Sequence, residues 1–300
     1  MNKIRFSAFL FILALVANVS VAQKVKVLPD STSSKVFSLM TYNIRHGKGM
    51  DNNVNLARIA NEIALVAPDV VALQEVDYKT QRSGGEDTPA KISELTKLGY
   101  KSVFGKAILF EGGEYGNAIL SLEAPMAVAV IPLMGKEEPR CLLVAEFKDY
   151  FVANCHLSLD EESRVNSCYS ISSIIKEISD GKFKQDGKKI FSGKDKPIFL
   201  CGDFNATPES TDIFVLMKSF VWLSKSESFT FPSDKPDRIL DYIFLYKNKS
   251  GIKLMKEFEK KSKGMASWVQ PEDIASDHRP VNLVIVTSDK FLVQDILEEE

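Results

Sequence analysis

Short apolar runs of strand length, repeated along most of the chain, are the feature that most constrains its fold. Each run is rich in Val, Ile, Leu, Phe or Tyr and is bounded by turn or charged residues, which is typical of β-strands. Two of the runs are joined by Lys148-Asp149-Tyr150 and predict a hairpin. The predicted strands cover residues 36–43, 69–76, 115–121, 126–133, 141–147, 151–157, 197–201, 238–246 and 281–287.

Two amphipathic helices are predicted between these strands. Apolar residues recur at spacings of three and four within residues 56–66 and again within 171–178, which places them on one helical face. Asn52 and Asn53 are cap candidates for the first helix, and Asp160 precedes the second. The recurring residues are Leu56, Ile59, Ile63 and Val66, followed by Ile171, Ile174, Ile175 and Ile178.

The order of the predicted elements indicates the fold class. The chain begins with strand, helix and strand, continues with hairpin-linked strands and then resumes alternation, unlike the strict βα repeat of a barrel or a doubly wound sheet. It contains no internal repeat of solenoid period and no low-complexity tract. We therefore predict an α/β (α+β) fold, a four-layer sandwich in which two mainly antiparallel β-sheets pack face to face and are flanked by helices.

The first residues read as an export signal. Lys3 and Arg5 precede the apolar run 9–16, and the small residues Ser20 to Ala22 offer a cleavage site before Gln23. The run is shorter than the roughly 20 residues that span a bilayer, which disfavours a membrane anchor. We predict a signal peptide over residues 1–22, a single catalytic domain over 23–300, no transmembrane anchor after processing, and a periplasmic or extracellular location.

The net charge of the chain indicates which classes of partner it can bind. The formal net charge of −2 becomes −4 when Lys3 and Arg5 leave with the signal peptide, so no global positive field attracts a phosphate backbone. The Lys-rich stretch 182–196 contains Asp186 and Asp195 and reads as a solvated loop. Nucleic acid is disfavoured as a partner, although a locally basic groove remains an alternative, and no protein partner is indicated.

The four cysteines are too sparse for a disulfide-stapled scaffold. Folding the predicted hairpin about Asp149 pairs Leu143 with Cys155, which leaves Cys141 and Cys155 offset and poorly placed to bridge. We interpret the cysteines as packing residues, and a bond from Cys168 stays open.

Polar residues gather where the apolar runs end, where a rigid backbone can aim side chains into a cleft. Each alone has an ordinary explanation, such as a surface carboxylate or a turn cap. Their conjunction favours a site, because the chain has only three histidines and two of them occupy these ends. The residues are Asn43, Glu75, His156, Asp203, Asn205, Asp277 and His278.

Five motifs carry a resemblance to a known family. They are Thr41-Tyr42-Asn43-Ile44, the run from Pro68 to Val76 that contains Gln74-Glu75, Cys201-Gly202-Asp203-Phe204-Asn205, Asp241-Tyr242-Ile243 and Ser276-Asp277-His278-Arg279-Pro280. In order and spacing they resemble the endonuclease/exonuclease/phosphatase, or DNase I-like, superfamily over residues 36–287. The resemblance implies a two-sheet sandwich and a divalent-metal-dependent phosphoesterase.

The resemblance also implies roles for single residues. Glu75, Asn43 and Asp277 would bind the metal, and these hard oxygen ligands suit Mg²⁺, with Mn²⁺ as a substitute. The catalytic set would be His156, Asp203, Asn205, Asp241 and His278. In it Asp203 positions or deprotonates water, Asn205 holds a phosphoryl oxygen, and Asp241 orients His278. Asn117, Arg45 and His46 are candidate substrate or phosphate contacts.

These observations predict a secreted hydrolase that cleaves a small-molecule or lipid-linked phosphate ester by in-line attack of an activated water. His156 stands where abasic-site endonucleases carry Tyr, which argues against DNA repair. A secreted nuclease acting on DNA or RNA is the first alternative, and a non-catalytic module that binds phosphorylated ligands is the second. Fold resemblance does not choose the substrate, and monoester and diester both remain open.

Overall fold

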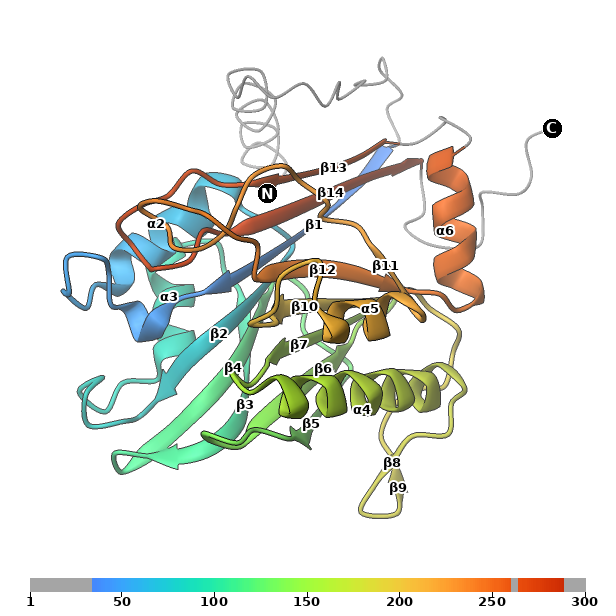
Figure 1. Ribbon diagram of the computed structural model, residues 1–300, viewed down its shortest axis with the longest axis horizontal. Helices are drawn as coiled ribbons and strands as arrows, with labels where there is room; N and C mark the ends of the chain where they lie inside the picture. Colours follow the sequence, from blue (N-terminus) through green and yellow to red (C-terminus); the bar gives the residue numbers. More distant parts are fainter. Residues whose placement is uncertain (1–33, 260–263, 289–300) are drawn as a thin grey trace.

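The computed structural model describes residues 34–259 and 264–288. Two six-stranded sheets pack face to face, and helices cover their outer sides (Figure 1). The predicted fold is confirmed, because each sheet is antiparallel except for one parallel pair, β1 with β2 in the first sheet and β7 with β10 in the second.

The strands of the first sheet, in spatial order, are β13 (Gly264–Val269), β14 (Val281–Ser288), β1 (Ser34–Asn43), β2 (Val70–Tyr78), β4 (Gly113–Ser121) and β3 (Lys101–Phe110). Those of the second are β11 (Phe220–Trp222), β12 (Asp241–Tyr246), β10 (Ile198–Asp203), β7 (Phe151–His156), β6 (Arg140–Glu146) and β5 (Ala127–Leu133). A small hairpin pairs β8 (Lys184–Gln185) with β9 (Lys188–Lys189).

Apolar side chains fill three layers between the secondary-structure elements. Residues such as Leu39, Val152 and Phe199 form the core between the sheets. The outer face of the first sheet packs against α2 (Leu56–Val66) and α3 (Thr88–Thr96), and that of the second against α4 (Glu161–Ser179) and α5 (Thr211–Met217). The last helix, α6 (Lys249–Glu259), adds Leu254 to the core between the sheets.

All nine predicted strands and both predicted helices are present, with strand ends shifted by a few residues and α4 beginning ten residues before the predicted range 171–178. Sequence reasoning missed β3, β8, β9, β11, β13, α3, α5 and α6. β3 and β13 are mostly half-buried or exposed, so they lack the alternation of a strand with one buried face. β11 and α5, of three and seven residues, are too short for a periodic signal.

The predicted caps of the two helices can be compared with the structure. Asp160 does cap α4, accepting from the Ser163 amide. The cap of α2 is Asn55 instead of Asn52 or Asn53, because its side chain lies within reach of the amides of Ala57 and Arg58.

The hairpin register was predicted one residue out. Leu142, not Leu143, lies opposite Cys155, because Phe147 and Tyr150 hydrogen-bond across a four-residue connection. The four cysteines are free and buried, as expected of packing residues.

The predicted signal peptide, residues 1–22, lies outside the described residues. No helix within the described ranges is long and apolar enough to cross a membrane. The domain boundaries of 23–300 stay a prediction.

A buried ion pair anchors the Lys-rich stretch to the β6–β7 hairpin. Lys196 Nζ lies 2.7 Å from Glu146 Oε1 and donates to the Phe147 carbonyl at 2.6 Å. Burial would raise the pKa of Glu146, but Lys196 and the Ser192 hydrogen bonds lower it overall. Only part of this stretch is therefore the solvated loop predicted, since Lys184, Lys188 and Lys189 are exposed and Lys196 is not.

We expect Lys196→Met to lower the free energy of unfolding by about 3 kcal/mol, because it leaves the buried Glu146 carboxylate without its cation. Lys182→Met is the matched control, since Lys182 is an exposed lysine that meets only the Asp180 carboxylate at the surface. Urea unfolding at neutral pH measures both. Equal stability of the two variants would contradict this role for the ion pair.

Candidate active site

The strand topology brings the predicted site residues to one edge of the sandwich. Asn43 ends β1, His156 ends β7, and Asp203 ends β10. Because β7 and β10 are parallel and in register, His156 lies directly beside Asp203, and Asp241 lies opposite Asp203 on the antiparallel β12. The register of the three strands therefore places His156, Asp203 and Asp241 side by side in one row.

Asp203 is the centre of this row and is almost fully buried. Its Oδ2 accepts from Asn43 Nδ2 at 2.9 Å, and its Oδ1 accepts from the Asn205 backbone amide at 2.8 Å. The Nε2 atoms of His156 and His278 lie 3.6 and 3.5 Å from Oδ2. Burial raises the pKa of Asp203, the His278 charge opposes that shift, and the Asp241 carboxylate adds to it.

His278 is held as a cation by its carboxylate neighbours. Its Nδ1 lies 2.9 Å from Asp241 Oδ2, and the Phe231 ring packs against the imidazole at 4.8 Å between centroids. Burial alone would lower the pKa of His278, but the carboxylates of Asp241 and Asp203 raise it to about 10. The imidazole is therefore charged at neutral pH, and Asp241 fixes its orientation.

Glu75 reaches the site through an irregularity in β2. The pairing of β2 with β4 shifts register between Leu73 and Val76, and Glu75 has a left-handed φ of 55°. A regular strand would turn Glu75 to the face opposite Gln74, toward the helices. The bulge redirects the carboxylate, which accepts from Asn43 Nδ2 at 3.0 Å.

Backbone constraints also shape the end of β10. Gly202 has a φ of 145°, and a Cβ there would lie 1.9 Å from the Cys155 carbonyl oxygen. Asn205 has a φ of 50°, a conformation that asparagine tolerates better than most residues. Its amide donates to the Leu157 carbonyl at 2.9 Å and lies 3.1 Å from His156 Nε2.

Asp277 joins the site through the loop before β14. The Ser276 hydroxyl donates to the Asn43 carbonyl at 2.8 Å, which ties this loop to the end of β1. Asp277 Oδ2 lies 3.3 Å from Arg45 Nε. Arg45 is thus placed at the site with its charge already opposed by a carboxylate.

The other two candidate substrate contacts have different surroundings. His46 is half-buried, and burial together with Arg82 lowers its pKa to about 4, so it is neutral at pH 7, and a substrate-binding role for His46 stays a prediction. Asn117 is buried and donates to the Cys141 carbonyl at 3.1 Å. Its amide nitrogen is directed at β6, and a phosphate-binding role for Asn117 stays a prediction.

Sequence reasoning missed four residues that support the site. Gln74 Nε2 donates to Asn154 Oδ1 at 2.7 Å, and Asn154 Nδ2 donates to the Leu73 and Ala118 carbonyls at 2.9 Å, so this pair joins the two sheets below the site. The Tyr115 hydroxyl hydrogen-bonds Glu75, and Arg140 contacts His156. Gln74 precedes a predicted site residue directly, but no sequence signal distinguishes Arg140.

The charge of the cluster fits a divalent cation. Glu75, Asp203, Asp241 and Asp277 supply four carboxylates, whereas Arg45 and the charged His278 supply two positive charges. The donor atoms are carboxylate and amide oxygens, which Mg²⁺ and Mn²⁺ prefer. A divalent ion held by Glu75, Asn43 and Asp277 would offset this excess of carboxylates over cationic side chains.

A tighter group of potential metal ligands consists of Asp203, Asp241 and His278, whose ligand atoms lie within 4.8 Å of one another. We assign this trio to hydrogen bonding instead of metal binding. Both ring nitrogens of His278 face carboxylates, Nδ1 that of Asp241 at 2.9 Å and Nε2 that of Asp203 at 3.5 Å, so the imidazole is placed to hydrogen-bond both.

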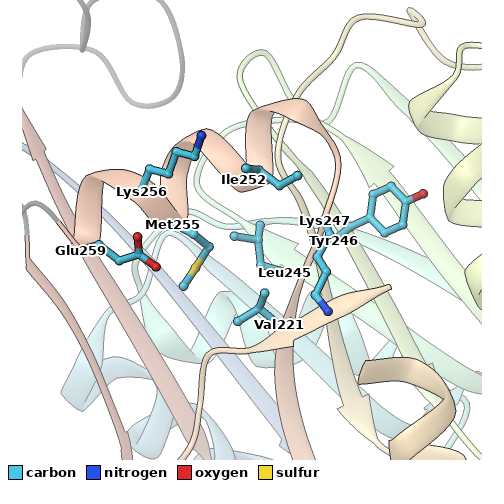
Figure 2. Close-up of a pocket in the computed structure, with 9 residues that line it drawn as sticks. Val221, Leu245, Tyr246, Lys247, Ile252, Met255, Lys256 and Glu259 are labelled. Carbon is cyan, nitrogen blue, oxygen red and sulfur yellow. The ribbon is translucent and has the colours of Figure 1, made fainter. Parts of the chain in front are cut away.

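The hollow in Figure 2 lies away from this cluster. It has a volume of about 280 Å³ and is formed by α6 together with β11 and β12, from Val221, Leu245 and Met255 among others. Leu245 and Asp241 are four residues apart on β12, which places the hollow roughly 13 Å along the strand from the site. Its mainly apolar lining offers no catalytic groups comparable to those of the cluster.

A two-sheet sandwich with carboxylates, amides and imidazoles at one edge is an arrangement suited to phosphoester hydrolysis. A model of the Endonuclease/Exonuclease/phosphatase family matches residues 40–278. The chain belongs to this family, whose members hydrolyse phosphoester bonds. No curated protein matches the chain at a significant level.

Solved structures share the fold at low sequence identity. An endonuclease/exonuclease/phosphatase from Beutenbergia cavernae is 20% identical with a TM-score of 0.60, covering 83% of this chain and 71% of its own. A mannosyl-6-phosphatase from Bacteroides thetaiotaomicron is 16% identical with a TM-score of 0.61, and the match covers 86% of this chain and 100% of the phosphatase. A truncated TDP2 from Caenorhabditis elegans is 19% identical with a TM-score of 0.57, and the match covers 84% of this chain and 98% of the TDP2 chain.

We expect Asp241→Asn to lower kcat on the order of 10²-fold, because the amide no longer stabilises the charged His278. Asp237→Asn is the matched control, since Asp237 is an exposed aspartate just before β12 that pairs only with its neighbour Arg238. Steady-state kinetics on the best phosphate-ester substrate, with circular dichroism to verify folding, measures the difference. A well-folded Asp241→Asn variant with normal turnover would remove Asp241 from the site.

Proposed function

We propose that this protein is an exported, divalent-metal-dependent hydrolase of phosphate esters, acting on a small-molecule or lipid-linked monoester or diester. The observation that carries the proposal is the surroundings of Asp203. A buried carboxylate lies between a charged imidazole and a second imidazole, beside Asn205 and linked to Glu75 through the Asn43 amide, which donates to both carboxylates. This set supplies a base, charge-stabilising donors and oxygen ligands in one place.

Asp203 is suited to orient and deprotonate the attacking water. Burial raises the pKa of this carboxylate, which makes it a stronger base than a solvated aspartate. In the proposed step Asp203 takes a proton from the water, the water oxygen forms a new bond to phosphorus as the bond to the ester oxygen breaks, and the leaving oxygen takes up a proton from solvent while Asp203 returns its proton to solvent. Asn43 and the Asn205 amide hold the Asp203 carboxylate in position through both of its oxygens.

Donors on both sides of Asp203 are suited to bind the phosphoryl oxygens. His278 offers a positive charge, and His156 and Asn205 offer N–H groups from the adjacent strand end and turn. Such preorganised donors stabilise charge that develops in the transition state. When bound by Glu75, Asn43 and Asp277, Mg²⁺ would neutralise phosphoryl charge and polarise the ester.

The proposed substrate is compact because the protein lacks a duplex-binding charge pattern. Its formal net charge is −2, and the rim residue Arg45 is already paired with Asp277. A duplex binder replaces condensed counterions with many free Lys and Arg side chains. The relative named as a mannosyl-6-phosphatase makes sugar phosphates a reasonable first class to test.

We expect thorough chelation to abolish turnover and added Mg²⁺ or Mn²⁺ to restore it, because the carboxylate cluster repels an anionic substrate unless a cation balances it. Glu75→Gln should raise the Mg²⁺ concentration needed for half-maximal activity at least tenfold. Glu94→Gln, an exposed change on α3, should leave it unchanged. Full activity in a chelated sample would contradict metal dependence.

We expect phosphate esters to be hydrolysed with a higher kcat/KM than duplex DNA. The panel is mannose 6-phosphate, p-nitrophenyl phosphate, bis-p-nitrophenyl phosphate, a phospholipid in vesicles and duplex DNA, each across a salt series. Tight duplex binding would give a log–log salt slope of about −0.9 per phosphate neutralised. If DNA exceeded every ester and showed that steep slope, the protein would be a nuclease.

A further inference from the structure

Arg140 is a buried cation with an unusual partner. It begins β6, is 6% exposed, and places its Nη1 atom 3.1 Å from His156 Nδ1. Two carboxylates hold the guanidinium from the other side, Glu138 at 2.9 Å from Nη1 and Glu137 at 2.5 Å from Nη2. Glu137 also accepts from the Leu159 amide at 2.9 Å, so this cluster is fixed to the loop that follows His156.

The contact determines which nitrogen of His156 carries the proton. A guanidinium has only donors and stays protonated in proteins, so His156 Nδ1 must accept. On the other side of the ring, Nε2 faces the Asp203 carboxylate, with Oδ2 at 3.6 Å, while the nearby Asn205 amide nitrogen donates to the Leu157 carbonyl at 2.9 Å. Because the guanidinium only donates and the carboxylate only accepts, Nε2 is the protonated atom.

We propose that Arg140 is a positioning residue that holds His156 as the neutral Nε2–H tautomer and thereby aims an N–H group at a phosphoryl oxygen. The inference rests on the proposed function for its phosphate, although the tautomer itself does not. Burial, with Arg140 and His278 adding to it, lowers the pKa of His156 well below its ordinary value. The direction of that shift agrees with the geometry.

The two imidazoles beside Asp203 have opposite kinds of partner at Nδ1. Asp241 accepts a hydrogen bond from His278 Nδ1, whereas Arg140 donates one to His156 Nδ1. Their Nε2 atoms lie 3.5 and 3.6 Å from the same Asp203 oxygen. His278 would stabilise charge, and His156 would act as a hydrogen-bond donor with no proton to give up.

The direct test is long-range ¹H–¹⁵N NMR of the imidazoles in the full chain, which distinguishes the two tautomers and the imidazolium. The chain has three histidines, so His46→Gln and His156→Gln variants assign the signals. We expect a neutral Nε2–H ring for His156 in the unaltered protein near pH 7. A neutral Nδ1–H ring or an imidazolium would overturn the inference, whether or not the Arg140 variants fold.

Variants of Arg140 test whether this residue is the cause of the Nε2–H tautomer of His156. Arg140→Met should release His156 into a mixture of tautomers and lower kcat roughly 10- to 100-fold with little change in KM, as loss of a supporting partner does. Arg140→Lys keeps a donor and should retain the Nε2–H signal. Arg58→Met, on α2, is the control and should leave the His156 signal unchanged. An unaltered His156 signal in folded Arg140→Met would contradict the role of Arg140.

The two proposals fail in different ways. If the Nε2–H tautomer is found but no phosphate ester is hydrolysed, the proposed function is wrong and the role of Arg140 in fixing the ring stands. If esters are hydrolysed while His156 carries its proton on Nδ1, the inference about Arg140 is wrong and the proposed function stands.

Discussion

The hydrogen bond from Asn43 to Asp203 is the interaction on which the site depends. It spans 2.9 Å between the end of β1 in one sheet and the end of β10 in the other, so the site exists only while the sheets are packed. Asn43 binds Glu75 with the same nitrogen, which links the carboxylate proposed for the metal to the carboxylate proposed for the water. A change in the packing of the sheets would separate these two groups.

The scaffold below supports this bond with both apolar and polar contacts. Side chains such as Leu39, Val152 and Phe199 fill the layer between the sheets, and burial of that apolar surface stabilises their packing. The Gln74–Asn154 pair crosses the same layer just below the site and satisfies buried backbone carbonyls. Gln74 Oε1 has no hydrogen-bond partner among the described residues, but the other polar contacts of the pair favour one register where an apolar core would allow several. Among the described non-glycine residues with a left-handed backbone, Arg45, Glu75 and Asn205 lie at the site itself.

Much of the fold and part of the candidate site could be predicted from the sequence. Strands with one or both faces buried leave a strong apolar pattern, and parallel strands end at a common edge of a sheet. Asn43, His156 and Asp203 were found on that basis, and the structure brings them together. The bulge at Glu75 could not be foreseen, since a register shift depends on the partner strand β4. Arg140 was missed because its role follows from a contact with His156, sixteen positions away, and an arginine at the start of a strand is common. The neutrality of His46 also could not be foreseen from the sequence, since it arises from burial and from the nearby Arg82.

The most direct test of the account is the turnover of Asp203→Asn, which keeps the shape of the side chain and removes the base. The substitution should retain the Asn43 contact through its amide oxygen, so folding and Mg²⁺ binding, measured by circular dichroism and calorimetry, should survive. We expect kcat to fall on the order of 10²-fold or more under saturating Mg²⁺. Near-normal kcat in a folded, metal-binding Asp203→Asn protein would show that Asp203 is not the base and would contradict the central claim.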